Sequence, residues 1–356
     1  MRMQNAEISP PFTPPVVQNS VRLEGGGRRR FHFLFSIILF IGLSSCIFFS
    51  GDYDDLHPPE DFAFIHHGTA PPILATRNST LYDIYAFSSD ASGMLAIYNV
   101  IYSHNPYLLS QLQLPTNQTI RKIEVDWRLH LYIAAGSAGV YIVDASSPSY
   151  PTIANDYTSI NAQDISLQED YLAITDDAGW KLMYISSSSQ LSEINSYRFF
   201  DSRQPERILL RNNWVYVFSR YDIDIFDITN IYNIQHEGSF NFFYPIIDFD
   251  IIGNFIALLT TNDLIYIDIS NPLFAYIASE FGLAWTPRTM SVRDNMLFIS
   301  WDNRSLSAYQ VWGVHQLPTE NARINLSYAV QDIDFKDDLI YLSMGGGGLQ
   351  IFYYME

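Results

Sequence analysis

A short apolar stretch that usually ends in a polar residue recurs seven times between residue 99 and the C-terminus. The clearest copies are residues 139–144, 222–227 and 263–268, each of which ends in aspartate. The residues that end the seven copies are Asn99, Asp144, Tyr184, Asp227, Asp268, Gln310 and Tyr353. Their spacings are 45, 40, 43, 41, 42 and 43, a period of about 42 residues. Since one four-stranded propeller blade has this length, the repeat predicts an all-β, seven-bladed propeller of four-stranded antiparallel blades.

The repeat that ends at Asp144 shows how one blade is built. Residues 123–125 alternate apolar and polar side chains, residues 131–135 predict a second strand, and residues 140–143 a third. An Asp-Ala-Ser-Ser-Pro turn precedes an outer strand at residues 152–157. Because a propeller grows by adding such blades, we expect residues 61–356 to form one domain.

The last repeat has no outer strand of its own, because the sequence ends soon after residues 349–352. An open blade would leave a free strand edge. Residues 62–65, Phe-Ala-Phe-Ile, are similar to the outer-strand sequence Phe-Ala-Tyr-Ile at residues 274–277. We therefore expect the N-terminal strand to pair with the strand that ends at Phe352 and to complete the seventh blade.

Two of these blades resemble a known repeat. Residues 132–135 and 139–144, followed by Ser-Ser-Pro at 146–148, and residues 265–272 are similar to the LVIVD repeat, which is named for its Leu-Val-Ile-Val-Asp core. The resemblance covers roughly residues 61–356 and is looser in the other blades. It implies a bacterial or archaeal extracytoplasmic propeller, in a family without a common established activity. Three of the seven blades end in tyrosine or glutamine, so a role tied to the aspartate cannot apply to them.

The first 46 residues have the order of an export signal. Three arginines at 28–30 precede an apolar run at 31–43, and Leu-Ser-Ser-Cys at 43–46 resembles the bacterial lipobox, in which the cysteine is lipidated. Cys46 is the single cysteine of the chain, which excludes a disulfide framework. We therefore predict a signal and anchor segment at 1–46, a lipid on Cys46, and a charged tether at 47–60.

Two other interpretations of this segment stay open. Ile-Phe-Phe follows Cys46, and residues 31–50 form an apolar run of about 30 Å as a helix, long enough for an uncleaved transmembrane anchor. Residues 28–31 also partly match a twin-arginine signal, although Gly27 replaces the usual serine or threonine. The lipid and the uncleaved helix both place the propeller outside the cytoplasmic membrane, in the cell envelope.

The domain is strongly acidic. Residues 1–46 hold five arginines and two glutamates, which leaves 15 basic and 36 acidic residues and a formal charge of −21 for the rest. Phosphate backbones and anionic lipid surfaces would be repelled by such a charge. We therefore expect no nucleic-acid partner, and membrane contact only through the lipid or the N-terminal helix.

Aligned inner strands predict a ring of polar residues near one mouth of the central channel. The equivalent positions are Lys122, Asp164, Arg207, Asp248, Thr289 and Asp332. We favour a structural role, in which these side chains bond to one another and to backbone groups, because buried charges need partners. The alternative is a small-ligand or cation site. The two cations beside three carboxylates argue against a dense metal site.

No residue pattern indicates catalysis. The eight histidines never occur at a metal-binding spacing, and no nucleophile elbow is present, so we predict no catalytic residue, no metal and no cofactor. Trp180, Trp285 and Trp301, which align with positions in or near turns, are candidates for a sugar- or peptide-binding surface, although packing is the favoured role. The sequence therefore favours a non-catalytic binding or scaffolding propeller for protein or glycan. The alternative is an exported hydrolase or lyase with its site at the channel mouth.

Overall fold

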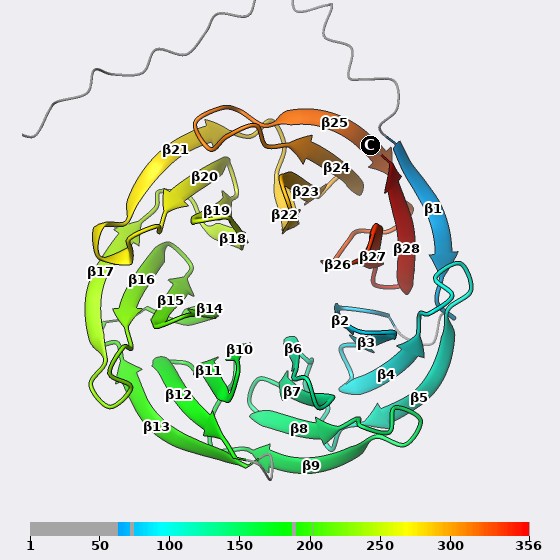
Figure 1. Cartoon of the computed structure of the whole chain (residues 1–356), viewed down its shortest axis with the longest axis horizontal. Coiled ribbons are helices and arrows are strands. Elements are labelled where there is room, and N and C mark those ends of the chain that lie inside the picture. Colours follow the sequence, from blue (N-terminus) through cyan, green and yellow to red (C-terminus); the bar gives the residue numbers. More distant parts are fainter. Residues whose placement is uncertain (1–62, 72–74, 187–189, 202, 356) are drawn as a thin grey trace, which may run out of the picture. The chain divides into compact units, whose positions relative to one another are not determined.

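The computed structural model describes residues 63–71, 75–186, 190–201 and 203–355. They form seven four-stranded antiparallel sheets arranged around a central axis (Figure 1). Within the described residues the one helical element is a single 3-10 turn, η2 (Pro272–Phe274). The predicted fold class, an all-β propeller of seven blades, is confirmed.

Each blade takes its strands in chain order from the axis outward, except the seventh. Blades 1 to 3 are β2 (Asn78–Tyr82), β3 (Tyr85–Ser89), β4 (Met94–Asn99) and β5 (Tyr107–Gln113); β6 (Lys122–Val125), β7 (His130–Ala134), β8 (Val140–Asp144) and β9 (Thr152–Tyr157); and β10 (Asp164–Gln168), β11 (Tyr171–Thr175), β12 (Gly179–Ile185) and β13 (Leu191–Arg198). Blades 4 to 6 are β14 (Pro205–Arg211), β15 (Trp214–Ser219), β16 (Asp222–Asp227) and β17 (Gln235–Asn241); β18 (Ile246–Ile252), β19 (Phe255–Thr260), β20 (Asp263–Asp268) and β21 (Tyr276–Gly282); and β22 (Pro287–Arg293), β23 (Met296–Trp301), β24 (Ser305–Gln310) and β25 (Thr319–Asn325).

Blade 7 joins the two ends of the described chain. It contains β26 (Asp332–Lys336), β27 (Leu339–Ser343), β28 (Leu349–Met355) and β1 (Ala63–Thr69). β1 pairs antiparallel with β28, from Ala63 opposite Met355 to Thr69 opposite Gln350, and Figure 1 shows the two strands side by side. The predicted closure of the ring is confirmed, although Phe62, which the sequence places in this strand, lies outside the described residues.

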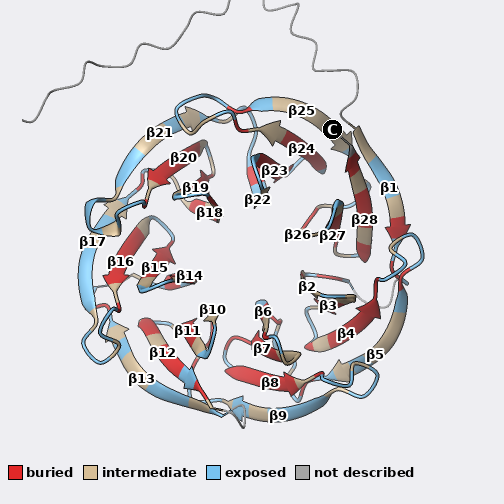
Figure 2. Ribbon diagram, in the orientation of Figure 1, coloured by how far each residue is buried: buried red, intermediate tan, exposed pale blue. Residues whose placement is uncertain are grey.

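The hydrophobic core lies between neighbouring blades, because each sheet buries both of its faces. One cluster packs Leu95 and Ile97 of β4 against Leu131 and Ile133 of β7, all of them fully buried. Figure 2 shows this burial in the second and third strands, while the outermost strands are largely exposed. Burial of such a side chain stabilises the fold by about 1.5–3 kcal/mol, so the apolar runs of the sequence repeat make the blades stack.

A tight turn joins the first two strands of every blade. In six blades the residue after the inner strand has a left-handed φ, between 51° and 59°, and in blade 2 the left-handed residue is Leu129, just before β7, with a φ of 63°. These residues are Asp83, Leu129, Glu169, Asn212, Gly253, Asp294 and Asp337. Asparagine, aspartate and glycine tolerate this conformation best, so the turn explains why polar residues and a glycine follow the inner strands.

The two faces of the disc differ in their loops. We call the mouth face the one at which the inner strands begin; the connections that lead from one blade into the inner strand of the next lie there, and so do the turns between the second and third strands of each blade. β1 is an outer strand and runs toward this face, so the chain enters the propeller at the opposite face. The described residues contain no helix of sufficient length and apolar character to cross a bilayer. Cys46, the signal segment and the tether lie outside the described residues, and the predictions made for them stay predictions.

Candidate functional site

The aligned positions of the inner strands meet around the axis. Lys122, Asp164 and Asp332 occupy the same register in their blades, opposite Ala134, Thr175 and Ser343. The structure adds a seventh member that the sequence comparison missed, Asn78 of β2, which lies opposite Ser89. The sequence could have indicated this member, because Asn78 precedes Lys122 by 44 residues, close to one blade period. We call these seven residues the axial ring; the other members are Arg207, Asp248 and Thr289.

The three aspartates of the axial ring tie blades together. An inner strand is the edge of its sheet, so some of its N–H groups have no partner within the blade. In each case the aspartate Oδ2 accepts a hydrogen bond from a backbone N–H of the next blade, where a buried residue would otherwise leave that group unpaired. The bonds join Asp164 to Ile208 at 2.9 Å, Asp248 to Met290 at 3.0 Å and Asp332 to Ser79 at 3.0 Å. Blades 3, 5 and 7 are thereby linked to blades 4, 6 and 1.

A second layer repeats this arrangement two residues deeper in the channel. The acceptors are again side-chain oxygens of blades 3, 5 and 7, and the donors are N–H groups of the following blade. The bonds join Ser166 to Leu210 at 2.9 Å, Asp250 to Val292 at 2.7 Å and Asp334 to Leu81 at 2.9 Å. Two layers of side-chain oxygens, five of them from carboxylates and one from a serine, therefore serve the contacts between blades.

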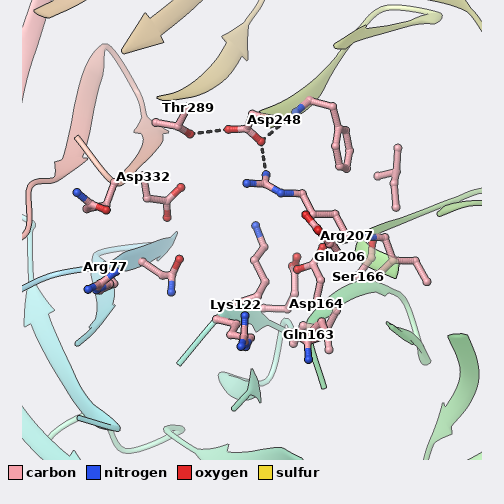
Figure 3. A pocket seen from close by; sticks show the side chains of 18 of the residues that line it. Arg77, Lys122, Gln163, Asp164, Ser166, Glu206, Arg207, Asp248, Thr289 and Asp332 are labelled. Carbon is pink, nitrogen blue, oxygen red and sulfur yellow. Dashed lines mark hydrogen bonds and ion pairs between the residues drawn. The ribbon is translucent and has the colours of Figure 1, made fainter. Parts of the chain in front are cut away.

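The remaining members of the axial ring behave differently. Arg207 forms an ion pair with Asp248, and the Thr289 hydroxyl donates to the same carboxylate at 2.5 Å. Asn78 donates to the backbone oxygen of Ile120 at 2.7 Å. Figure 3 shows the Lys122 side chain pointing into the middle of the space that these residues surround. Lys122 is exposed to the channel and makes no direct ion pair within the described part of the chain.

Burial and neighbouring charges shift several pKa values in the channel. Burial of the Lys122 amine opposes its charge, but the carboxylates of Glu124, Asp332 and Asp164 outweigh this and raise its pKa. Burial raises the pKa of Glu124 to about 7, against the lowering effect of Lys122. Burial, followed by the Asp332 charge, raises the pKa of Asp334 to about 7. Two carboxyl groups therefore titrate near neutral pH.

These two groups predict how stability depends on pH. A pKa that is higher in the folded than in the unfolded protein means that the folded state binds more protons, so stability falls as the pH rises from about 4 through 7. In the Glu124→Gln, Asp334→Asn double variant, we expect the loss of unfolding free energy between pH 5 and pH 8 to be smaller by about 1–2 kcal/mol than in the natural protein. The expected difference is modest because channel water screens both carboxyl groups. Urea unfolding of both proteins at the two pH values measures it. An equal change of unfolding free energy with pH in the two proteins would contradict the raised pKa values of Glu124 and Asp334.

The axial ring surrounds a cavity of about 700 Å³ that opens on the mouth face. Its wall includes both layers of inner-strand residues and, at the rim, Arg77, Arg121, Gln163, Gln204 and Gln331 from the loops. This volume lies within the usual range of small-ligand sites. No group of three or more metal-ligating side chains was found among the described residues.

Two of the three candidate tryptophans pack inside the propeller. Trp180 lies in β12 and Trp301 ends β23, and both are fully buried. Trp180 contacts Phe226 edge-on, and the Trp301 Nε1–H donates to Ser307 Oγ at 2.9 Å. Each lies next to a turn but belongs to a strand packed between blades, so both have the favoured packing role and neither offers a binding surface. Trp285 does lie in a mouth-face loop and is half exposed.

Comparisons with known proteins agree with this architecture. The family model described as the LVIVD repeat matches residues 130–159, 161–198 and 248–273. A search of curated proteins found no match.

Similar solved structures include the computationally designed Ika8 protein (10% identity, TM-score 0.61, 81% of this chain and 99% of that one). Another is the Pan2 WD40 domain of Neurospora crassa (9% identity, TM-score 0.65, 82% of this chain and 95% of that one). A third is Sqt1 of Saccharomyces cerevisiae (9% identity, TM-score 0.57, 82% of this chain and 97% of that one). At these identities the likeness concerns the fold alone.

The sheet order and the axial cavity thus define a seven-bladed β-propeller. LVIVD repeats are present in blades 2, 3 and 5, where the family model matches, as the resemblance of the sequence implied.

Proposed function

We propose that this chain is a non-catalytic binding or scaffolding propeller, held in the cell envelope outside the cytoplasmic membrane, which takes its ligand at the mouth face. One observation carries the proposal: a polar cavity of about 700 Å³ opens on the face opposite the one at which the chain enters. A tether that precedes Ala63 joins the propeller at that entry side. An anchored propeller would then present its cavity away from the tether.

The axial ring supports a binding rather than a catalytic role. Its aspartates already accept hydrogen bonds from neighbouring blades, so they hold the cavity in shape and are not free for chemistry. A rigid, preformed cavity is what a binding module needs, because less freedom is lost when the ligand binds.

One observation favours the second candidate, an exported hydrolase or lyase. Glu124 lines the cavity, and its pKa of about 7 suits a general acid or base at neutral pH. The two functions differ in the fate of the ligand, which a binding protein releases unchanged.

The test uses the full-length protein to capture ligands from envelope extracts. We expect Gln204→Trp, which narrows the cavity rim, to lose the ligand, while Gln235→Trp on the outer strand β17 retains it. Mass spectrometry of the released ligand distinguishes the candidates, because cleaved products would support the enzyme. Capture that is equal for both variants would contradict a mouth-face site.

The anchor has its own prediction. If Cys46 carries acyl chains, Cys46→Ala should abolish labelling by a fatty-acid probe and leave an unprocessed precursor. Each buried methylene contributes about 0.8 kcal/mol, so two or more chains give stable attachment to the membrane. Labelling and precursor size are read on gels of whole cells. A natural protein that is never labelled, and whose size is the same in the variant, would favour the uncleaved helix.

A further inference from the structure

Four aromatic side chains lie in successive loops of the mouth face, two or three residues after the end of an outer strand. They are Phe200, Phe243, Trp285 and Tyr328, spaced 43, 42 and 43 residues apart. Their exposed fractions are 99%, 88%, 48% and 46%. We call these four residues the aromatic arc. Exposed rings also occur near the opposite face, among them Tyr150 and Tyr232. What marks the aromatic arc as a candidate binding surface is that its loops share the face on which the cavity opens.

Two members of the aromatic arc are held in place. The Arg323 guanidinium lies 4.1 Å from the centre of the Trp285 ring, and Trp301 contacts that ring edge-on at 5.9 Å. The Tyr328 ring lies over the glycine tract of blade 7, where a Cβ on Gly347 would come within 2.7 Å of the ring. The glycines thus make room for the tyrosine. Rings fixed before binding lose little entropy when a ligand stacks on them.

The same face carries cations without acidic partners. Four arginines of the mouth-face loops have no carboxylate partner among the described residues: Arg77, Arg121, Arg220 and Arg304. Arg220 lies over the Tyr221 ring, 5.7 Å from its centre, and Arg304 donates to a backbone oxygen at 3.5 Å.

Two arginines near the opposite face are paired with carboxylates, and a third, Arg211, donates to the backbone oxygen of Gly253 at 2.9 Å. Arg128 contacts Asp126 at 3.0 Å, and Arg293 contacts Asp338 at 2.8 Å. In a domain with a formal charge of −21, unpaired guanidinium groups gathered on one face indicate an anionic ligand.

We propose that the mouth face binds an oligosaccharide that carries carboxylate groups. The proposal rests on the binding function proposed above and names the ligand of that site. Sugar rings stack their C–H faces on the aromatic arc, and the carboxylates pair with the unpaired arginines. The loops of the arc also bring Gln204 and Gln331 to the cavity rim, where amides exchange hydrogen bonds with sugar hydroxyls. The acidic charge of the domain repels nucleic acids and uronates alike at long range, so attraction to the ligand carboxylates has to come from the four unpaired arginines of the mouth face.

The experiment measures binding of the full chain by calorimetry. The probes are hexameric oligogalacturonates and oligomannuronates, and the matched neutral probes are hexamers of glucose and mannose. We expect the uronates to bind and the neutral hexamers to bind at least tenfold more weakly, about 1.4 kcal/mol by the affinity relation. Phe243→Ala and Trp285→Ala should each weaken uronate binding by about two- to tenfold. Trp127→Ala changes a ring that is 75% exposed near the opposite face and should have no effect.

The arginines have a separate readout. Arg121→Gln should weaken uronate binding, flatten its dependence on salt concentration and leave the weak binding of neutral hexamers unchanged. Melting temperatures of all variants show that the fold is intact.

Three results would overturn the proposal: no uronate binding by the folded protein, equal affinity for neutral and acidic hexamers, or unchanged affinity in Phe243→Ala and Trp285→Ala. If uronates fail while an envelope protein is captured and then lost in Gln204→Trp, the glycan assignment fails and the binding function stands. If neither is captured, both proposals fail.

Discussion

Removal of residues 58–70 should destabilise the propeller far more than removal of residues 1–55. The reason is that β1 supplies the outer strand of blade 7 and so closes the ring. Its Phe64 packs against Tyr354 and Phe298, and Ala70 is fully buried. Lost strand pairing and a newly exposed edge should cost about 5 kcal/mol or more, or a melting temperature lower by about 10 °C. Calorimetric melting of both deletions measures the difference.

The deletion of residues 1–55 is the matched control, because it shortens the chain and leaves β1 in place. A synthetic peptide of residues 58–70 should partly restore the melting temperature of the opened ring. Equal melting temperatures for the two deletions would contradict the closure of the blade as a source of stability.

Asp248→Ala should lower the free energy of unfolding by about 2–4 kcal/mol. The change removes the partner of the Arg207 guanidinium and of the Thr289 hydroxyl, and leaves the N–H of buried Met290 without an acceptor. Arg207 is partly exposed to channel water, so the expected loss is smaller than for a fully buried ion pair. Urea unfolding measures the change.

Two further variants separate the contributions. Asp248→Asn keeps an acceptor for the Met290 N–H and should cost less than alanine, while Thr289→Val removes only one hydroxyl and should cost about 1 kcal/mol. If Asp248→Ala left stability unaltered and abolished binding of a ligand that stabilises the natural protein, the axial ring would be a binding site instead of a structural network.

The fold could be predicted from the sequence because the same physical requirement acts on every blade. Each second and third strand must bury both faces, so apolar runs such as residues 131–135 recur at the blade period. The closing strand could also be predicted, since residues 62–65 repeat the pattern of another outer strand. The sequence comparison missed Asn78 because β2 has the sequence Asn-Ser-Thr-Leu-Tyr, which lacks the alternation of apolar and polar side chains expected of an inner strand.

The site was less predictable for a different reason. Spacing aligned the axial ring, but no sequence pattern shows that an aspartate bonds to the backbone of the next blade rather than to a neighbouring cation. The sequence placed Trp180 and Trp301 in or near turns, but only the structure shows that neighbouring blades cover both side chains. The aromatic arc has a clear spacing, yet its meaning depends on knowing that its four loops share one face of the disc.

Parity constrains the axial ring in a way that its individual bonds do not. Acidic and non-acidic residues alternate from blade to blade, with aspartates in blades 3, 5 and 7, and a closed circle can alternate without fault only if its number of places is even. Seven blades force one mismatch, which falls where Asn78 and Lys122 stand side by side in sequence order around the circle. An eighth blade could restore the alternation, whereas this propeller keeps a surplus cation at the mismatch, directed into its cavity.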